Sequence, residues 1–349
     1  MILRDNIHFS SREVDGYGKP FISIISEREA GKSTDIIMKI YNAFKNYGQT
    51  SIVLRRLIND ITETYIDDMA NVINKFTDDH VVLEYAKKGL KEGIVNVKID
   101  GRLFFRVIAL SNPVSRMKSL MLPNLRYMIF DEFICNPAFK EKYLPDEATR
   151  FKELYNTFQR ESSKLTCYFM GNPYSKYNPY FVWWGVDTNS LKSGTIQSGS
   201  NWVVQAYKIK DELKELILKR NPLYQFDDAY KRYAFDGESI NDANIRVAEL
   251  PEKYSLKFVF KIEGKYIGVF QNNYWEDNQD KYHCQFISTL SARRTAYCFD
   301  FGELLEGTAM IGREEKSKFN RFKIAMRNRN ITFSSIEVYY LIEEVYYNL

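Results

Sequence analysis

The chain of 349 residues is poor in the residue types that build metal centres and disulfide frameworks. Its three histidines, His8, His80 and His283, are too few and too scattered to form a zinc site. Its four cysteines are widely spaced and include no C-x-x-C pair, so we expect reduced core thiols. Because the sequence has neither a bilayer-length apolar run nor a signal peptide, we expect no membrane partner.

Internal repeats and low-complexity tracts are also absent, which excludes solenoid and fibrous architectures. The apolar fraction of 45% and the charged fraction of 27% are those of an ordinary globular protein, and the length indicates two domains. A net charge of +4 permits a polyanionic partner without requiring one. The function must therefore be sought in local motifs.

Residues 26–34 form the most informative motif, because they contain Gly31-Lys32-Ser33-Thr34. An apolar run at 21–25 precedes them, and a helical pattern follows from Asp35. Strand, short loop, Gly-Lys-Ser and helix is the layout of a phosphate-binding P-loop, in which backbone N–H groups and a helix N-terminus surround the phosphates. The alternative is a solvated helix N-terminus that contains these residues by chance.

Each residue type in the loop has a chemical use. Gly31 lets the backbone approach the phosphates, Lys32 would reach the β- and γ-phosphates, and Ser33 would ligate Mg²⁺. Two positions are unusual. Ser26 replaces the first glycine of the consensus, and Arg28 would either add charge near the γ-phosphate or face solvent.

A second motif, residues 126–133, is an apolar strand that ends in Asp131 and Glu132. This is a Walker B pattern, in which Asp131 would hold Mg²⁺ through water and Glu132 would act as general base toward the attacking water. The alternative is a strand that ends in a solvated acidic pair. The nucleotide and magnesium candidates are accordingly Ser26, Arg28, Gly31, Lys32, Ser33, Thr34 and Asp131.

Two further polar residues are catalytic candidates. Asn172 follows the apolar strand 165–170 and would contact the γ-phosphate or the attacking water, unless it only forms a turn before Pro173. Arg160 lies between a helix and this strand, where it would serve as an arginine finger toward a neighbouring subunit or remain a surface arginine. The predicted catalytic set is thus Lys32, Glu132, Arg160 and Asn172.

The order of elements predicts an α/β fold with a mostly parallel sheet covered on both faces. Strands are expected at 21–25, 51–55, 81–85, 94–98, 103–109, 126–130 and 166–170, and helices at 33–47, 58–75 and 147–160. Composition predicts a loop at 185–201 and a charged helical stretch at 208–235. A hairpin at 258–270 opens a β-rich second domain that ends in a helix over 335–348.

Basic residues gather in three places. Arg55-Arg56 end the second strand, and Arg116 and Lys118 precede the Walker B strand; these could contact nucleotide or DNA phosphates or form a solvated face. Residues 313–329 carry seven basic side chains against two acidic ones, with apolar residues interleaved. The last segment is either a phosphate-contacting helix or an ordinary amphipathic helix. Its DNA-contact candidates are Arg321, Lys323 and Arg327.

These motifs together resemble the DNA-packaging ATPases of small podophages of the phi-twenty-nine-like (Picovirinae) type. Order and spacing agree over most of the chain, and the Asp131-Glu132 block is the most specific element. The matching landmarks are the loop 26–33, Leu54-Arg55-Arg56, residues 129–134, residues 157–160, Gly171-Asn172, residues 178–181 and the hairpin strand at 257–260. The departures are Ser26 and Ile58, the latter where a basic residue can follow the second strand.

The resemblance implies a P-loop NTPase domain of the class with an additional catalytic glutamate (ASCE, RecA-like) at 1–184, a linker or lid at 185–250 and a vestigial RNase H-like nuclease domain at 251–349. It assigns Arg160 to a trans-acting arginine finger and places Lys118 on the path toward the channel and the neighbouring site. The expected cofactors are ATP and Mg²⁺. The expected partners are double-stranded DNA, further copies in a ring of five, and a procapsid portal in the host cytoplasm, with a structural RNA as an additional candidate.

Two other functions remain compatible with the motifs. One is a P-loop ATPase of another kind, such as a helicase or another DNA translocase. The other is a nucleotide-binding DNA scaffold that does not turn over. In the second domain, Glu263, Asp277, Asp280, Asp300 and Glu303 have no spacing that builds a two-metal nuclease, which agrees with a domain that grips nucleic acid without cutting it.

Overall fold

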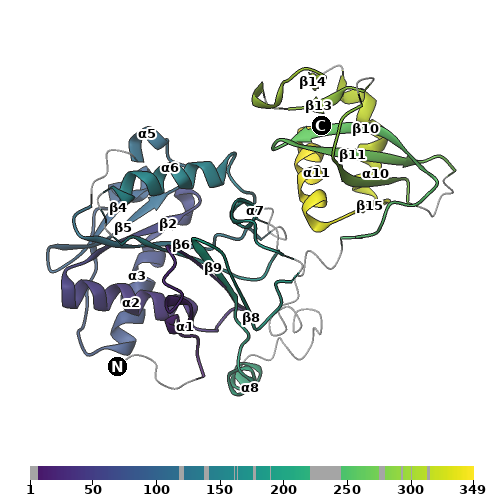
Figure 1. Cartoon of the computed structure of the whole chain (residues 1–349). Helices are drawn as coiled ribbons and strands as arrows, with labels where there is room; N and C mark the ends of the chain where they lie inside the picture. Colours follow the sequence, from purple (N-terminus) through teal and green to yellow (C-terminus); the bar gives the residue numbers. More distant parts are fainter. Residues whose placement is uncertain are drawn as a thin grey trace. The chain divides into compact units, whose positions relative to one another are not determined.

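The computed structural model describes residues 7–117, 122–136, 141–160, 162, 164–175, 178–188, 190–220, 245–274, 280–291, 294–299, 301–312 and 315–349. The chain divides into two compact units, residues 1–241 and 242–349 (Figure 1). This division differs from the boundaries at 184 and 250 that the sequence suggested. Among the described residues, no helix has the length and hydrophobicity needed to cross a membrane.

A nine-stranded sheet forms the centre of the first unit, in the order β3-β4-β5-β2-β6-β7-β1-β9-β8. The strands from β5 through β9 in this order are parallel, and antiparallel pairs occur at both edges. The strands are β1 (Phe21–Ile25), β2 (Thr50–Arg55), β3 (Glu84–Tyr85), β4 (Ile94–Ile99), β5 (Arg102–Ala109), β6 (Leu125–Asp131), β7 (Thr166–Gly171), β8 (Thr195–Ser198) and β9 (Trp202–Ala206).

Helices cover both faces of this sheet, as predicted. Figure 1 shows α2 and α3 on one face and α5 and α6 on the other, and each face carries its own cluster of buried apolar side chains. The helices of the unit are α1 (Arg12–Asp15), α2 (Lys32–Tyr47), α3 (Glu63–Phe76), α4 (Lys87–Glu92), α5 (Val114–Met117), α6 (Glu147–Gln159), α7 (Pro179–Trp184) and α8 (Asp211–Arg220), with a 3-10 turn at Ile58–Asp60.

The strand order places the motifs at one sheet edge. The P-loop strand β1 lies between β7 and β9, and β7 separates it from β6, which carries the two carboxylates. Because β1, β6 and β7 run parallel, their carboxyl ends meet at the same edge, where ligands of open α/β sheets bind. One strand inserted between the P-loop strand and the carboxylate strand is the arrangement of the ASCE class.

Several element predictions need correction. The segment 185–201, expected as a loop, contains β8, which pairs with β9 and extends the sheet beyond β1. The strand was not predicted because its residues are polar. An edge strand can be polar, since it forms backbone hydrogen bonds with a neighbour on one side only. The helix expected from 58 begins at Glu63, where Thr62 caps it by accepting from the Tyr65 N–H. The strand expected at 81–85 is reduced to Glu84–Tyr85. In the stretch 208–235, α8 ends at Arg220 and the remainder lies outside the described residues.

The second unit is built on a six-stranded mixed sheet, in the order β14-β13-β10-β11-β12-β15. The predicted hairpin is β10 and β11, and its turn uses Glu263 and Gly264 with positive φ angles of 49° and 74°. The elements are β10 (Tyr254–Ile262), β11 (Lys265–Asn272), β12 (Tyr282–Ile287), β13 (Ala296–Cys298), β14 (Thr308–Met310), β15 (Ile331–Phe333), α10 (Asn320–Arg327) and α11 (Ile336–Asn348), with 3-10 turns at Phe301–Glu303 and Glu315–Phe319.

Two of the acidic candidates in this unit form ion pairs with basic side chains. Glu303 forms an ion pair with the buried Lys261 at 3.0 Å, and Asp280 forms one with Arg246. Asp277 and Asp300 lie outside the described residues. Within the described ranges, no three His, Cys, Asp or Glu side chains are grouped as a metal site would require. The part of the unit that the structure describes therefore offers no two-metal nuclease centre.

Candidate nucleotide-hydrolysis site

The P-loop connects β1 to α2 at the carboxyl edge of the sheet. Gly31 has a φ of +94°, a conformation that L side chains rarely adopt, and a Cβ added there would lie 3.3 Å from Cβ of His8. The N-terminal segment supports the loop from outside, since the N–H of Phe9 donates to the carbonyl of Ala30 at 2.9 Å. Both the positive φ angle and the closeness of the His8 side chain therefore favour glycine at position 31.

The serine at position 26 has a structural explanation. The left-handed conformations of the loop fall on Glu29 and Gly31, and φ of Ser26 is not positive. Ser26 is buried, its N–H donates to the carbonyl of Gly171 at 3.2 Å, and its hydroxyl donates to the carbonyl of Glu27 at 3.1 Å. A residue other than glycine is therefore accommodated here without backbone strain.

Lys32 is the first residue of α2, and its side chain links the loop to Asn172, the residue after β7. Its ammonium donates to the carbonyls of Ser26 (3.1 Å) and Glu27 (3.3 Å) and to the Asn172 side-chain oxygen (2.8 Å). The structure thereby brings together two residues that lie 140 positions apart and were both predicted as catalytic. Burial lowers the pKa of Lys32 to about 8, although the negative charges of Asp131 and Glu27 oppose the shift.

This pKa predicts a pH dependence of nucleotide binding. Below about pH 8 the free site holds a charged ammonium, whereas above it the cation must be regenerated by proton uptake when a phosphate binds. The affinity for ADP should therefore fall above pH 8, approaching tenfold per pH unit. Calorimetric titration from pH 7 to 9.5 measures this slope. Lys32→Ala should bind more weakly at every pH and lack the slope, and a wild-type affinity unchanged up to pH 9 would contradict the assignment.

The two Walker B carboxylates end β6. Asp131 is the last residue of the strand, and Glu132 follows with a φ of +57°, unusual for a residue with a side chain. The chain then turns toward β7, where the Phe133 N–H donates to the Met170 carbonyl at 3.2 Å. Burial raises the pKa of Asp131, while the Arg55 guanidinium opposes that rise. Glu132 is 61% exposed and so is open to the nucleotide edge of the sheet.

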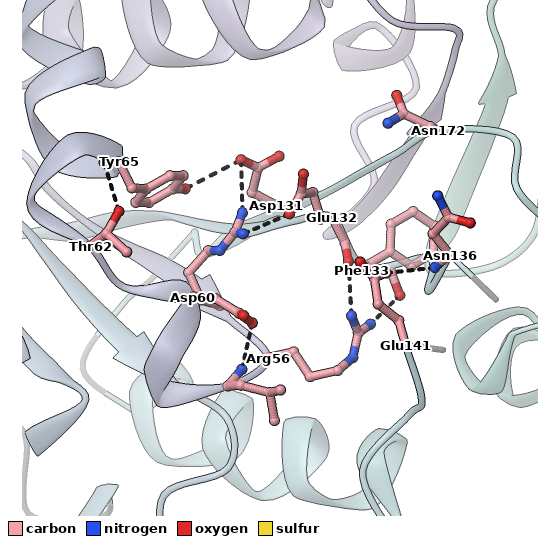
Figure 2. Close-up of polar contacts among 12 residues, drawn as sticks. Arg56, Asp60, Thr62, Tyr65, Asp131, Glu132, Phe133, Asn136, Glu141 and Asn172 are labelled. Carbon is pink, nitrogen blue, oxygen red and sulfur yellow. Dashed lines mark hydrogen bonds and ion pairs between the residues drawn. The ribbon is translucent and has the colours of Figure 1, made fainter. Parts of the chain in front are cut away.

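Arg55 and Tyr65 complete this cluster. Arg55 donates to Asp131 (3.4 Å) and to Glu132 (2.6 Å), and its guanidinium lies 4.6 Å from the centre of the Tyr65 ring. The Tyr65 hydroxyl donates to the same Asp131 oxygen at 3.3 Å, as Figure 2 shows. Burial and the adjacent Asp131 raise the pKa of Tyr65 well above its usual value, so the hydroxyl keeps its proton. Tyr65 was missed because nothing in the sequence separates it from the other tyrosines.

Arg56 needs a correction. The sequence made it a candidate for a phosphate contact, with a solvated basic face as the alternative, but its side chain is only 7% exposed and donates to Glu147 at 2.8 Å. It also donates to the backbone carbonyls of Glu132 (3.1 Å) and Phe133 (2.6 Å). These partners follow β6 or begin α6. The Arg56 guanidinium therefore stabilises the turn that contains Glu132. Arg56 is thus a buried structural cation.

The other predicted residues are distributed around the loop. Arg28 is exposed and donates to the Tyr174 hydroxyl at 3.0 Å, beside Asn172. Ser33 and Thr34 open α2 directly after Lys32 and are partly exposed. Arg160 is exposed at the carboxyl end of α6, and within the described residues it makes no hydrogen bond or ion pair with the loop. Arg116 forms an ion pair with Glu92, and Lys118 lies outside the described residues.

In the second unit, α10 has two different faces. Phe322 and Ala325 are buried, and Phe322 contacts the sheet residues Phe258 and Tyr282. Arg321 and Arg327 are exposed, and Lys323 lies over the Tyr346 ring at 5.8 Å. Helix α10 therefore packs against the sheet with its apolar face, as expected of an amphipathic helix. Its two exposed arginines are accessible to a polyanion.

A P-loop whose lysine contacts the asparagine after β7, next to an Asp-Glu pair that ends β6, defines a P-loop NTPase of the ASCE class. The chain belongs to the family described as podovirus DNA encapsidation protein (Gp16), whose model matches residues 4–338.

Sequence relatives agree with this membership, and solved structures share the fold. The chain is 30% identical over 272 residues to the DNA packaging protein of Bacillus phage phi29, covering 76% of each chain. It is 26% identical over 298 residues to that of Bacillus phage B103, covering 84% of this chain and 86% of the relative. A chain of the bacteriophage Phi-29 viral genome packaging motor assembly superposes with a TM-score of 0.65 at 19% identity, covering 97% of this chain and 98% of that one. A chain of the Phi-28 gp11 DNA packaging motor gives a TM-score of 0.63 at 17% identity, with 94% of each covered.

Proposed function

We propose that this protein is an ATP-hydrolysing motor that moves double-stranded viral DNA into a procapsid. The observation that carries the proposal is the meeting of Lys32, Asn172, Asp131 and Glu132 at the carboxyl edge of one parallel sheet. Membership of the DNA encapsidation family supports the substrate. Phage relatives described as DNA packaging proteins support the same assignment.

The residues at this edge fit a magnesium-bound nucleoside triphosphate. The Lys32 ammonium donates to three oxygen acceptors of the described residues, which phosphate oxygens can replace, and helix α2 starts at the loop. Asp131 is a partly buried carboxylate near Lys32, and Ser33 supplies a hydroxyl at the start of α2. Bound Mg²⁺ would supply charge neutralisation to the phosphates, with Ser33 and, through water, Asp131 holding it.

Hydrolysis then depends on three side chains. Glu132 would accept a proton from the attacking water as general base. Asn172, already bonded to Lys32, would orient that water or the γ-phosphate and return to Lys32 after product release. Arg55 donates to both carboxylates, so Glu132 would exchange this contact for one to water during turnover.

The site is proposed to be shared between subunits of a homo-oligomeric ring of five, with Arg160 supplied in trans. Its exposure, and the lack of a described contact with the P-loop of its own chain, agree with such a role. The ring would assemble at a procapsid portal in the host cytoplasm, where a structural RNA is a further candidate partner. Arg321, Lys323 and Arg327 of α10 are proposed to contact DNA phosphates without reading bases.

The trans role of Arg160 predicts complementation. Arg160→Ala should lower the ATPase rate by about 10³-fold or more, since arginine fingers contribute that much to phosphoryl transfer. Lys32→Ala should be equally inactive because it lacks the phosphate-binding cation. Mixing the two proteins should restore part of the rate, as some interfaces then combine an intact P-loop with an intact finger. Normal activity of Arg160→Ala alone would remove it from the site.

A triplex-displacement assay tests DNA movement itself. A protein that translocates on duplex DNA should release a third strand in the presence of ATP while leaving the duplex intact. Glu132→Gln should release none. Separation of the duplex strands would instead indicate a helicase, and ATP binding without turnover or displacement would indicate a scaffold.

A further inference from the structure

A cavity of about 860 Å³ lies beside the P-loop in the first unit, and Asp131 and Glu132 are not among its lining residues. Residues 29–34 of the loop and of the start of α2 form one wall. The end of α3 and the whole length of α8 form the others. A nucleotide whose phosphates occupy the loop would place its base and sugar in this cavity, because residues 29–34 belong to both the cavity wall and the phosphate-binding loop.

The walls opposite the loop carry several apolar side chains. Val72 and Phe76 line the cavity from α3, and Leu213, Leu216 and Ile217 line it from α8. Leu213 and Ile217 are buried at 4% and 3% exposure, whereas Leu216 is 54% exposed. Helix α8 thus packs one side into the core and leaves a leucine open at the cavity. Such a surface favours a flat aromatic group rather than water.

Helix α8 is also tied to the loop. Arg220, at its carboxyl end, forms an ion pair with Glu29, which has a positive φ of 66° in the loop. This exposed contact links the end of α8 to the phosphate-binding loop. The cationic side chains of Lys75 and Lys219 line the same cavity and are suited to polar groups of a sugar phosphate.

We propose that this cavity binds the nucleoside of the nucleotide, with a purine base between Phe76 and Leu216. This assignment rests on the proposed function, because it places the base and the sugar of a nucleotide whose phosphates the P-loop would hold. A purine buries more apolar area against these side chains than a pyrimidine, so the site should favour ATP over CTP. Helix α8 is thereby a nucleotide-binding element within the segment that the sequence assigned to a linker or lid.

Binding of Mg²⁺-ATP, Mg²⁺-CTP and Mg²⁺-tripolyphosphate to the full-length protein tests this. Tripolyphosphate occupies the loop but not the cavity. Leu216→Ser should weaken ATP binding about tenfold, leave tripolyphosphate binding unchanged and reduce the preference for ATP over CTP. Leu216→Met should restore ATP binding, and Leu305→Ser, at a leucine that is 60% exposed in the second unit, should change nothing.

The possible outcomes separate the two proposals. Unchanged ATP affinity in Leu216→Ser would overturn the nucleoside site while leaving the P-loop assignment intact. An equal loss for ATP and tripolyphosphate would also overturn it, because the effect would then act through the loop. If wild-type protein bound neither ligand, the proposed ATPase function itself would fail, and the nucleoside site with it.

Discussion

Replacing Glu132 with glutamine is expected to reduce the steady-state ATPase rate by about 10²–10⁴-fold while leaving ATP binding nearly unchanged. In the proposed mechanism this carboxylate accepts a proton from the attacking water, and glutamine keeps its shape without its basicity. The side chain is 61% exposed, so the substitution should not destabilise the fold. Phosphate release and nucleotide affinity, measured on the same preparation, separate the chemical step from binding.

A matched control is available on α3. Glu63 forms an exposed ion pair with Lys87 at 2.7 Å, much as Glu132 pairs with Arg55, but it lies outside the cluster around Asp131. Glu63→Gln should retain the wild-type rate. Equal rates for Glu132→Gln and wild type would show that another group acts as the base.

Replacing Arg56 with methionine is expected to cost about 3–5 kcal/mol of unfolding free energy. The change leaves Glu147 buried without its cation, since the Glu147 side chain has no exposed surface. The Tyr180 hydroxyl donates to Glu147 at 3.1 Å and should offset part of this loss of unfolding free energy. Tryptophan fluorescence during urea denaturation measures the effect in the first unit, which holds Trp183, Trp184 and Trp202.

Two further variants test the cause. Arg56→Met combined with Glu147→Gln should recover part of the loss, because the second substitution removes the unpaired charge. Arg160→Met, at an exposed arginine, should change stability by about 0.5 kcal/mol or less. A single Arg56→Met variant as stable as wild type would mean that its ion pair with Glu147 contributes nothing to the fold.

The sequence predicted the residues of the site that belong to the P-loop and Walker B motifs. The glycine, lysine and strand-end carboxylates each have a fixed relation to an adjacent strand, so local spacing was enough to place them. The contact between Lys32 and Asn172 could be expected in outline, since the carboxyl ends of parallel strands meet. The helical cover on both faces followed from the buried character of the strands.

The remainder depends on tertiary placement. Arg55 and Arg56 are neighbours in sequence, yet one contacts the carboxylates that end β6 and the other is buried against Glu147. Their directions are set by the path of the chain after β2, which periodicity does not encode. Tyr65 joins the site only because α3 begins at Glu63, and the strand β8 was hidden by a polar composition. Ser26 was unexplained by the consensus and is explained by its backbone conformation.

The ATPase rate with and without double-stranded DNA, measured over a salt series, tests the coupling of this site to DNA most directly. We predict that DNA raises the rate at low salt. The stimulation should decline with the logarithm of salt concentration, because phosphate contacts release counterions. Glu132→Gln should stay at the background rate throughout. A wild-type rate that DNA leaves unchanged at every salt concentration, or that does not differ from buffer, would contradict a DNA-translocating ATPase.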